Sequence, residues 1–144
     1  IIPDSVTKIG TGAFTGCSGL TNIIIPDSVT EIADEVFYFC GLIHIVIPDT
    51  VIKIGKDAFS DCSSLTSVII PHSVAEIGDE AFFGCTNLKT VIIESTIIKT
   101  IKDNAFENVH ADIHFTVKTD AVKAMLKKNA TIRDEQITVA PSKS

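Results

Sequence analysis

The feature that most constrains this chain is a unit of about 23 residues that recurs almost from end to end. Successive units are marked by phenylalanines at intervals of 23, 22, 23 and 24 residues: Phe14, Phe37, Phe59, Phe82 and Phe106. A cysteine follows the first four by three positions: Cys17, Cys40, Cys62 and Cys85. A period in the low twenties that contains Leu-x-x-Val-x-Ile is typical of a leucine-rich solenoid, in which each coil buries its apolar residues against its neighbours. The sequence therefore predicts a solenoid of short parallel strands and short helical turns.

Two apolar stretches in each unit predict strands. The first alternates with a period of two, as in Leu65, Val68 and Ile70, which indicates a strand with one buried face. This strand ends at a proline: Pro3, Pro26, Pro48 and Pro71. Asp-Ser or Asp-Thr follows the first three and turns the chain. The second stretch carries a pair of apolar residues in each unit: Val29 and Ile32, Val51 and Ile54, Val74 and Ile77, Ile98 and Ile101. It predicts a second short strand on another face of the coil.

The segment after the second strand predicts one helical turn that carries the Ala-Phe pair. A glycine frees the backbone there at Gly10, Gly55 and Gly78. The acids that follow form a ridge: Asp34, Glu35, Asp57, Asp79, Glu80 and Asp103. We interpret them as caps, because carboxylates accept hydrogen bonds from free N–H groups and favour the positive end of a helix dipole. Calcium binding is the alternative, but the spacing of an EF-hand loop is missing.

The units predict three parts of the chain. Residues 1–117 form the solenoid, with a partial first unit, four full units and a divergent last unit. Residues 118–139 form a C-terminal cap: an amphipathic helix over 119–129 and a strand over 131–139. Thr119 or Asp120 caps the helix, and its apolar face holds Ala121, Val122, Met125 and Leu126. We expect residues 140–144 to be a disordered tail. Because the chain begins inside a unit, we also expect a fragment of a longer protein, with an open apolar end that could self-associate.

Charge and cysteine placement narrow the function classes. The formal net charge is −6, so we expect no binding to nucleic acid or to an anionic membrane surface. No apolar run approaches the roughly 20 residues that cross a bilayer. The cysteines predict buried free thiols, because side chains in a ladder lie side by side and do not face one another. We expect no metal, since His44 and His114 lie about three coils or ~14 Å apart. We find no nucleophile elbow or phosphate loop and expect no enzymatic activity and no cofactor.

The outward positions of the first strand form an apolar column with polar residues beside it. The column is Ile24, Val46, Ile69 and Ile92, and the polar neighbours are Asn22, His44, Ser67 and Thr90. One interpretation is a stripe that docks a partner protein, for which the candidate contacts are Ile24, His44, Val46, Ser67, Ile69, Thr90 and Ile92. The other is that β-branched residues were selected for strand propensity. Both interpretations remain open at this point.

A column of alternating charge lies on the second strand: Lys8, Glu31, Lys53 and Glu76. Opposite charges on adjacent strands attract, whereas like charges repel. We therefore expect this column to favour the correct stacking of coils.

The unit A-F-x-x-C-x-x-L-x-x-[IV]-x-I-P-x-x-V-x-x-I-G resembles the BspA-like (Treponema-type) leucine-rich repeat family over roughly residues 1–117. Departures are the unit of 22 residues from Val36 to Asp57, Glu94 in place of proline, and the divergent last unit. The resemblance implies a cell-surface or secreted protein of anaerobic bacteria or mucosal protists. It also implies adhesion to host extracellular proteins or microbial surface proteins. We thus expect a non-catalytic protein-interaction module that binds through the strand face. The alternative is a structural spacer in a longer surface protein.

Overall fold

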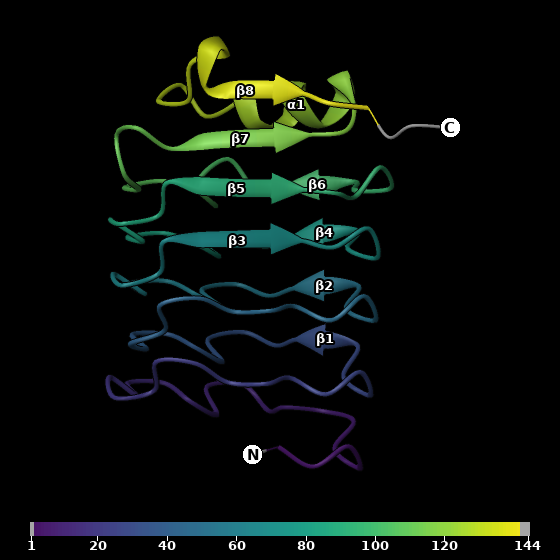
Figure 1. Ribbon diagram of the computed structural model, residues 1–144, viewed down its shortest axis with the longest axis vertical. Coiled ribbons are helices and arrows are strands. Elements are labelled where there is room, and N and C mark those ends of the chain that lie inside the picture. The colour runs from purple at the N-terminus through teal and green to yellow at the C-terminus, as the bar shows by residue number, and fades with distance from the viewer. Residues whose placement is uncertain (1, 142–144) are drawn as a thin grey trace.

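The computed structural model describes residues 2–141 and forms a solenoid whose coils stack one on another (Figure 1). One parallel sheet has the order β1 (Glu31–Ile32), β2 (Lys53–Ile54), β4 (Glu76–Ile77) and β6 (Thr100–Ile101). A second parallel sheet has the order β3 (Ser67–Ile70), β5 (Thr90–Ile93), β7 (His114–Val117) and β8 (Ile137–Val139). The helix α1 (Asp120–Lys127) and the 3₁₀ turn η1 (Asp134–Gln136) follow β7. The predicted solenoid of short parallel strands with a C-terminal helical cap is confirmed.

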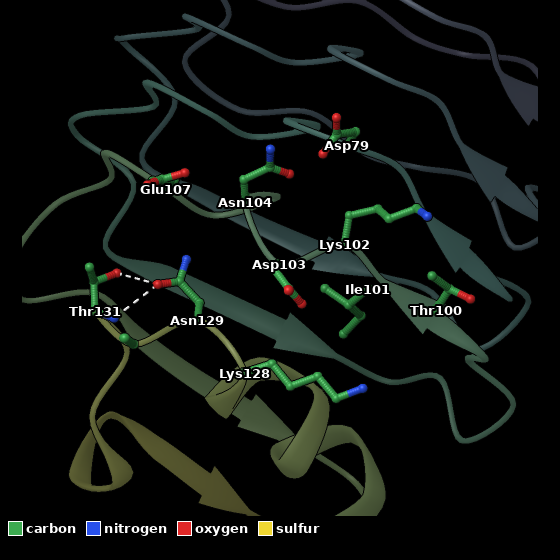
Figure 2. A pocket seen from close by; sticks show the side chains of 11 residues that line it. Asp79, Thr100, Ile101, Lys102, Asp103, Asn104, Glu107, Lys128, Asn129 and Thr131 are labelled. Carbon is green, nitrogen blue, oxygen red and sulfur yellow. Dashed lines mark hydrogen bonds between the residues drawn. The ribbon is translucent and has the colours of Figure 1, made fainter.

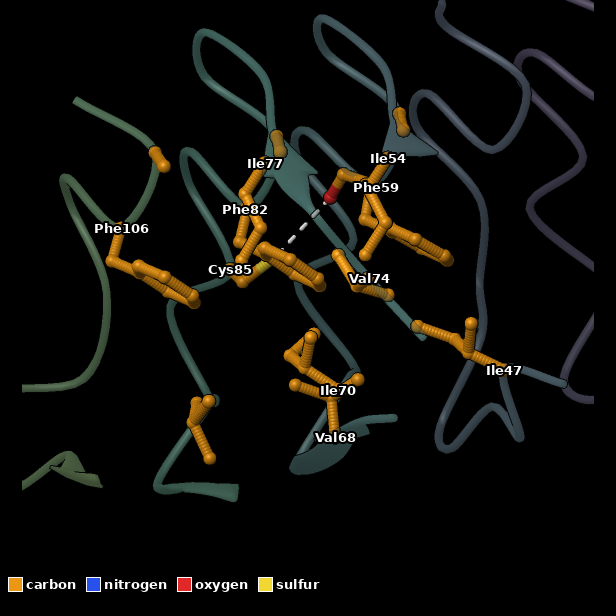
Figure 3. Close-up of a cluster of buried hydrophobic side chains, with 14 of the residues drawn as sticks. Ile47, Ile54, Phe59, Val68, Ile70, Val74, Ile77, Phe82, Cys85 and Phe106 are labelled. Carbon is orange, nitrogen blue, oxygen red and sulfur yellow. Dashed lines mark hydrogen bonds between the residues drawn. The ribbon is translucent and has the colours of Figure 1, made fainter. Parts of the chain in front are cut away.

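The repeated phenylalanines form one continuous stack along the core. The ring centroids of Phe14, Phe37, Phe59, Phe82 and Phe106 lie 5.6, 5.3, 5.1 and 5.1 Å apart in succession, with nearly parallel planes. Phe115 closes the stack edge-on against Phe106, at 5.0 Å. The strand residues surround the rings from both sheets (Figure 3). Burial of these large apolar side chains is the main source of stability, and each unit contributes one ring to the same file.

Ladders of side-chain hydrogen bonds join the coils inside the core. Each buried thiol donates to the carbonyl of the phenylalanine one coil earlier: Cys40 to Phe14 at 2.9 Å, Cys62 to Phe37 at 3.0 Å and Cys85 to Phe59 at 3.1 Å. Hydroxyls in the turn after the first strand of each unit donate in the same way to a valine carbonyl: Ser28 to Val6, Thr50 to Val29, Ser73 to Val51 and Ser95 to Val74. A buried carbonyl without a donor is costly, so these ladders explain why small polar residues recur at the two positions.

The predicted helical turns are wrong. The segments that carry the Ala-Phe pairs are stacked turns, because their amide groups alternate between two partners. Phe37 N donates to Ala58 O of the next coil at 2.9 Å, whereas Cys40 N donates back to Phe37 O at 3.2 Å. A helix would direct all these amides along its own axis. The acids consequently do not cap helices: the Asp34 carboxylate accepts from Lys56 N in the next coil at 2.9 Å.

The glycines after the second strand are needed for a different reason from the one predicted. A Cβ on Gly55 would lie 2.5 Å from Asp34 Oδ1 and 2.8 Å from the Ala33 carbonyl carbon, and one on Gly78 would lie 2.8 Å from Gly55 C. Neither glycine has a positive φ. The bare Cα therefore allows close approach of successive coils, which any side chain would prevent.

The C-terminal segment covers the last coil. Thr119 caps α1 by accepting from Val122 N at 3.2 Å, and Val122 and Leu126 are buried. Met125 is half-buried and Ala121 is exposed, so the predicted apolar face was too wide. The predicted strand over 131–139 is limited to β8, which extends the second sheet beside β7. Gln136 is buried and donates to Ala111 O and Ile113 O at 3.2 and 3.0 Å. Of the predicted tail, residues 142–144 lie outside the described residues.

Within residues 2–141, no helix combines the length and the apolar character that a bilayer-spanning segment needs.

Candidate interaction surface

The structure places the predicted apolar column on one face of the solenoid. Ile24 and Val46 form a parallel bridge, and Ile69 pairs in register with Ile92. Ile24 is 82% exposed, Val46 is 75% exposed and Ile69 is 51% exposed, whereas Ile92 is half-buried. The register then continues into Thr116 and Thr138. The exposed apolar part of this column is thus confined to the first three coils, and the column becomes polar toward the C-terminus.

The predicted polar column lies on the same face, beside the apolar column. Ser67, Thr90 and His114 are paired in register, and all three side chains are exposed. His114 Nε2 lies 2.7 Å from Thr138 Oγ1, so the last histidine is held by the cap. His44 and Asn22 precede Val46 and Ile24 by two residues and are exposed. The surface therefore has an apolar file beside a neutral polar file.

The second coil interrupts the sheet on this face. In three other units the cysteine precedes the core leucine by three positions, but Cys40 precedes Leu42 by only two. The shortened loop lies tightly against the first coil: a Cβ on Gly41 would lie 2.0 Å from Ser18 O. Among the described residues, the pairing of segment 44–47 is limited to the bridge from Val46 to Ile24. The one-residue deletion thus coincides with the loss of a regular strand.

Two grooves flank this unpaired segment. A groove of about 480 Å³ lies between the first and second coils and is lined largely by Ile23, Ile24, Ile45 and Val46. A second groove, of about 270 Å³, lies between the second and third coils and includes Val46 and Ile69. His44 lines both grooves. Val46 is therefore the ridge between two apolar depressions, each of which could receive an apolar side chain of a partner.

Acidic side chains lie at one end of both grooves. Asp27 lines the first groove, and Asp49 and Glu94 line the second. Neither groove is lined by a lysine or an arginine. Glu94 occupies the position where other units have proline, and its amide donates to Ile70 O at 2.9 Å. The grooves therefore combine an apolar floor with a negative end.

Sequence reasoning missed Phe39, an exposed aromatic residue on the edge of the second coil. Its φ is +59° and its side chain is 55% exposed, with the ring edge-to-face against Tyr38 at 5.0 Å. The equivalent positions of the other units hold residues that tolerate a left-handed backbone: Gly16, Asp61, Gly84 and Asn108. Strain and apolar exposure at one position are typical of functional sites. The break in this series of small residues is the sequence signal that could have identified it.

A larger cleft lies elsewhere, between the last coils and the cap (Figure 2). It is an open cleft of about 700 Å³ with polar walls that include Asp103, Asn104, Glu107 and Asn129. Two of its amides are already engaged: Asn104 Oδ1 accepts from Glu80 N at 3.2 Å, and Asn129 Oδ1 accepts from Thr131 N and Oγ1 at 2.9 and 2.6 Å. We interpret this cleft as the seam between solenoid and cap, since its lining residues come from both parts.

The acid ridge lies on the outside of the stacked turns. Glu35, Asp57 and Glu80 occupy left-handed backbone positions. Burial raises the pKa of the Asp57 carboxyl; nearby Glu35 and Asp79 add to the rise, and Lys56 opposes it. Within residues 2–141, no group of three His, Cys, Asp or Glu side chains is placed to hold a metal ion.

The cysteine ladder holds thiols of low reactivity. All four cysteines are free, and Cys40, Cys62 and Cys85 are buried. Burial raises the pKa of Cys40 to about 11 and that of Cys62 to about 12, and it raises the pKa of Cys85 well above its ordinary value. The thiolate is the reactive form, so these residues serve packing and hydrogen bonding instead of nucleophilic chemistry.

The alternating charges of the second strand lie in register. Glu31 pairs with Lys53, and Lys53 pairs with Glu76, whose side chain lies 3.5 Å from the lysine Nζ. Thr100 follows Glu76 in the same column. Lys8 precedes β1 and takes no part in this ladder. The observed ion pair is exposed, so its expected contribution to stacking is small.

Comparison with known proteins is consistent with this geometry. Residues 1–112 match the family described as the BspA type leucine rich repeat region, in six copies. The crystal structure of the pneumococcal vaccine antigen PcpA is similar with a TM-score of 0.73 and 20% identity, covering 97% of this chain and 40% of that one. The crystal structure of the T. pallidum leucine-rich repeat protein has a TM-score of 0.60 and 24% identity, covering 95% of this chain and 81% of that one.

A leucine-rich cell surface protein from Faecalibacterium prausnitzii A2-165 has a TM-score of 0.54 and 22% identity, covering 78% of this chain and 35% of that one. At these low identities, the structural similarity shows a common fold and nothing more. The chain spans less than half the length of the pneumococcal antigen. No curated protein sequence matches the chain.

Proposed function

Because this chain belongs to the BspA-type leucine-rich repeat family, we propose that it is a non-catalytic module that binds a protein partner through its strand face. The observation that carries the proposal is the file of exposed apolar residues Ile24, Val46 and Ile69 on that face. Water disfavours such a file, and exposed apolar surface framed by polar residues is typical of protein-binding sites. His44, Ser67, Thr90 and Ile92 complete the proposed contact surface.

The repeat architecture favours this mode of binding. Stacked coils present equivalent positions at the strand spacing of roughly 4.8 Å, so one partner segment can contact several coils. The few apolar positions at the centre would supply most of the affinity, and the polar file beside them would supply orientation. Leucine-rich repeats of this type are in general non-catalytic, and a binding role needs no reactive group.

We further propose that the chain is part of a cell-surface or secreted adhesion protein, whose partner is a host extracellular or microbial surface protein. Two structural relatives support this: one is described as a vaccine antigen and another as a cell surface protein. Within the chain, residues 1–117 would act as the binding solenoid and residues 118–139 as its terminal cap.

The proposal is tested with a random-peptide display library selected on the folded chain. Enriched peptides should bind a Val46→Lys/Ile69→Lys variant at least about tenfold more weakly, because the lysines place charge at the centre of the contact. A matched control is Ile52→Lys/Ile97→Lys, which alters equally exposed isoleucines that precede β2 and β6. That control should bind within about twofold of the parent.

Enrichment of no peptide above a blank surface, or equal binding to both variants, would reject the strand face as a binding site. That result would favour the structural spacer, which tolerates charge changes on this face. Circular dichroism and thermal melting of each variant establish that the fold is retained.

A further inference from the structure

We infer that the two grooves beside Val46 bind an extended segment of a partner protein in which an apolar side chain lies two or three residues from a lysine or arginine. The inference rests on the proposed function of the strand face and specifies the chemistry of its partner. Three features of the grooves carry it: their apolar floor, the unpaired segment between them and the charge at one end.

The apolar floor selects an apolar side chain. Ile24 and Val46 are the most exposed large apolar residues among those described, and both line the first groove. The polar contribution there is restricted to Asn22 and His44 at one end and Asp27 at the other. The groove volume of about 480 Å³ lies within the range of pockets that bind small ligands or side chains. An aliphatic or aromatic side chain placed on this floor would remove both residues from water.

The unpaired segment favours an extended ligand. In the third to fifth coils the outward residues belong to a complete ladder, but segment 44–47 has only the bridge to Ile24 within the described range. The grooves consequently run alongside this segment, between neighbouring coils. An extended chain advances about 3.3 Å per residue, so Asp49 lies roughly 10 Å beyond Val46 along the strand. A partner residue two or three positions from the apolar anchor would reach the acidic end.

The charge at that end selects a cation. Asp27, Asp49 and Glu94 are exposed and line the grooves, and neither groove is lined by lysine or arginine. His72 Nδ1 lies 3.9 Å from Asp49 Oδ1, and among residues 2–141 no lysine or arginine forms an ion pair with these three carboxylates. The chain as a whole carries a net charge of −6. A lysine or arginine of the partner would complement this end, whereas an acidic partner would be repelled.

The test uses the peptides enriched on the folded chain in the display experiment. They should contain lysine or arginine two or three residues from an apolar residue more often than the unselected library. A fluorescein-labelled selected peptide should bind Asp27→Asn/Asp49→Asn roughly fivefold more weakly than the parent, and raising the salt from about 0.05 to 0.5 M should reduce that difference. Asp79→Asn/Asp103→Asn, on the acid ridge away from the grooves, is the matched control and should change binding by less than about twofold.

Three results would overturn the inference, and they differ in their bearing on the proposed function. Peptides that require Val46 and Ile69 but show no basic enrichment and ignore Asp27→Asn/Asp49→Asn would leave the strand face as a binding site with another partner chemistry. Failure of any peptide to depend on Val46 would reject both proposals. Self-association that is lost in Val46→Lys and is displaced by the selected peptides would place a second copy of the chain in the grooves, and would also overturn the inference.

Discussion

The first two coils and the third to fifth coils contain the same repeat, but they differ in how regularly their strands pair and how well their side chains are buried. In the later coils, β3, β5 and β7 pair over four successive positions, and Phe59, Phe82 and Phe106 are buried. In the first coil, Phe14 and Cys17 are only partly buried, and the strand face is reduced to the bridge between Ile24 and Val46. The exposed apolar residues are concentrated where the ladder is incomplete.

This difference indicates that regular strand pairing and the proposed binding surface occupy different parts of the solenoid. In the third to fifth coils the backbone groups of the strands are paired, and the outward column changes from exposed Ile69 through half-buried Ile92 to Thr116. Where one residue is missing from the loop before Leu42, the strand is unpaired and grooves open beside it. The departure from the repeat therefore coincides with the surface that we propose for binding.

The largest contrast between the two regions should appear in the phenylalanine stack. We expect Phe82→Ala to lower the free energy of unfolding by about 3–5 kcal/mol, because it leaves a cavity between two stacked rings. Phe14→Ala should cost less than half as much, since that ring is stacked on one side and partly exposed. Urea denaturation measures both changes. Equal losses would show that the first coil is as well packed as the fourth.

The buried thiols should make stability fall at alkaline pH. The pKa of Cys62 is about 12 in the folded protein and 9.0 in the unfolded reference, so the unfolded state binds fewer protons between these values. The contribution is complete below pH 9 and declines by about 1.4 kcal/mol per pH unit above it. In Cys62→Ser the hydroxyl can still donate to Phe37 O but does not titrate. The free energy of unfolding of this variant should fall less steeply than that of the parent from pH 9 to pH 10.5. Parallel slopes would contradict the raised pKa of Cys62.

Restoring the missing loop residue should convert the second coil to the order of the third. Insertion of one serine between Cys40 and Gly41 recreates the Cys-Ser-Gly-Leu sequence of the first coil. We expect slower amide hydrogen exchange in segment 44–47 and a gain of about 1 kcal/mol, equivalent to one or two additional backbone hydrogen bonds. Peptide binding in the grooves should weaken at the same time. Unchanged amide exchange would show that the missing residue is not the cause of the interrupted ladder.

The smallest effect is expected on the second-strand sheet, which is equally regular in both regions. Lys53→Glu replaces the partner of Glu76 and places three acids in one column with Glu31. We expect a loss of about 0.2–1 kcal/mol at low salt, because both side chains are exposed. The loss should disappear at high salt in a thermal melt. No change at low salt would show that the charge alternation plays no part in stacking.

Much of the fold could be predicted from particular residues. The interval between phenylalanines indicated a single stack of rings, and the alternation around Val68 and Ile70 indicated a strand with one buried face. The apolar column on the strand face could be predicted for the same reason, because period two places alternate residues outward. The stacked turns of the segments that carry the Ala-Phe pairs could not be predicted. Short runs of Ala, Phe and acidic residues suit a helical turn locally, and only the neighbouring coil supplies the competing acceptors.

The amino-acid sequence by itself determined the period, the stack and the parallel order of the coils, because each coil meets the next through the same few residues. Tertiary structure decided where the thiols and hydroxyls donate, why Gly41 and Gly55 must lack a side chain, and where the grooves lie. Each of these depends on groups about one unit apart in the chain whose separation is set by how closely two coils approach. A pattern of residue types carries no such distance, and a one-residue difference in a loop is enough to change it.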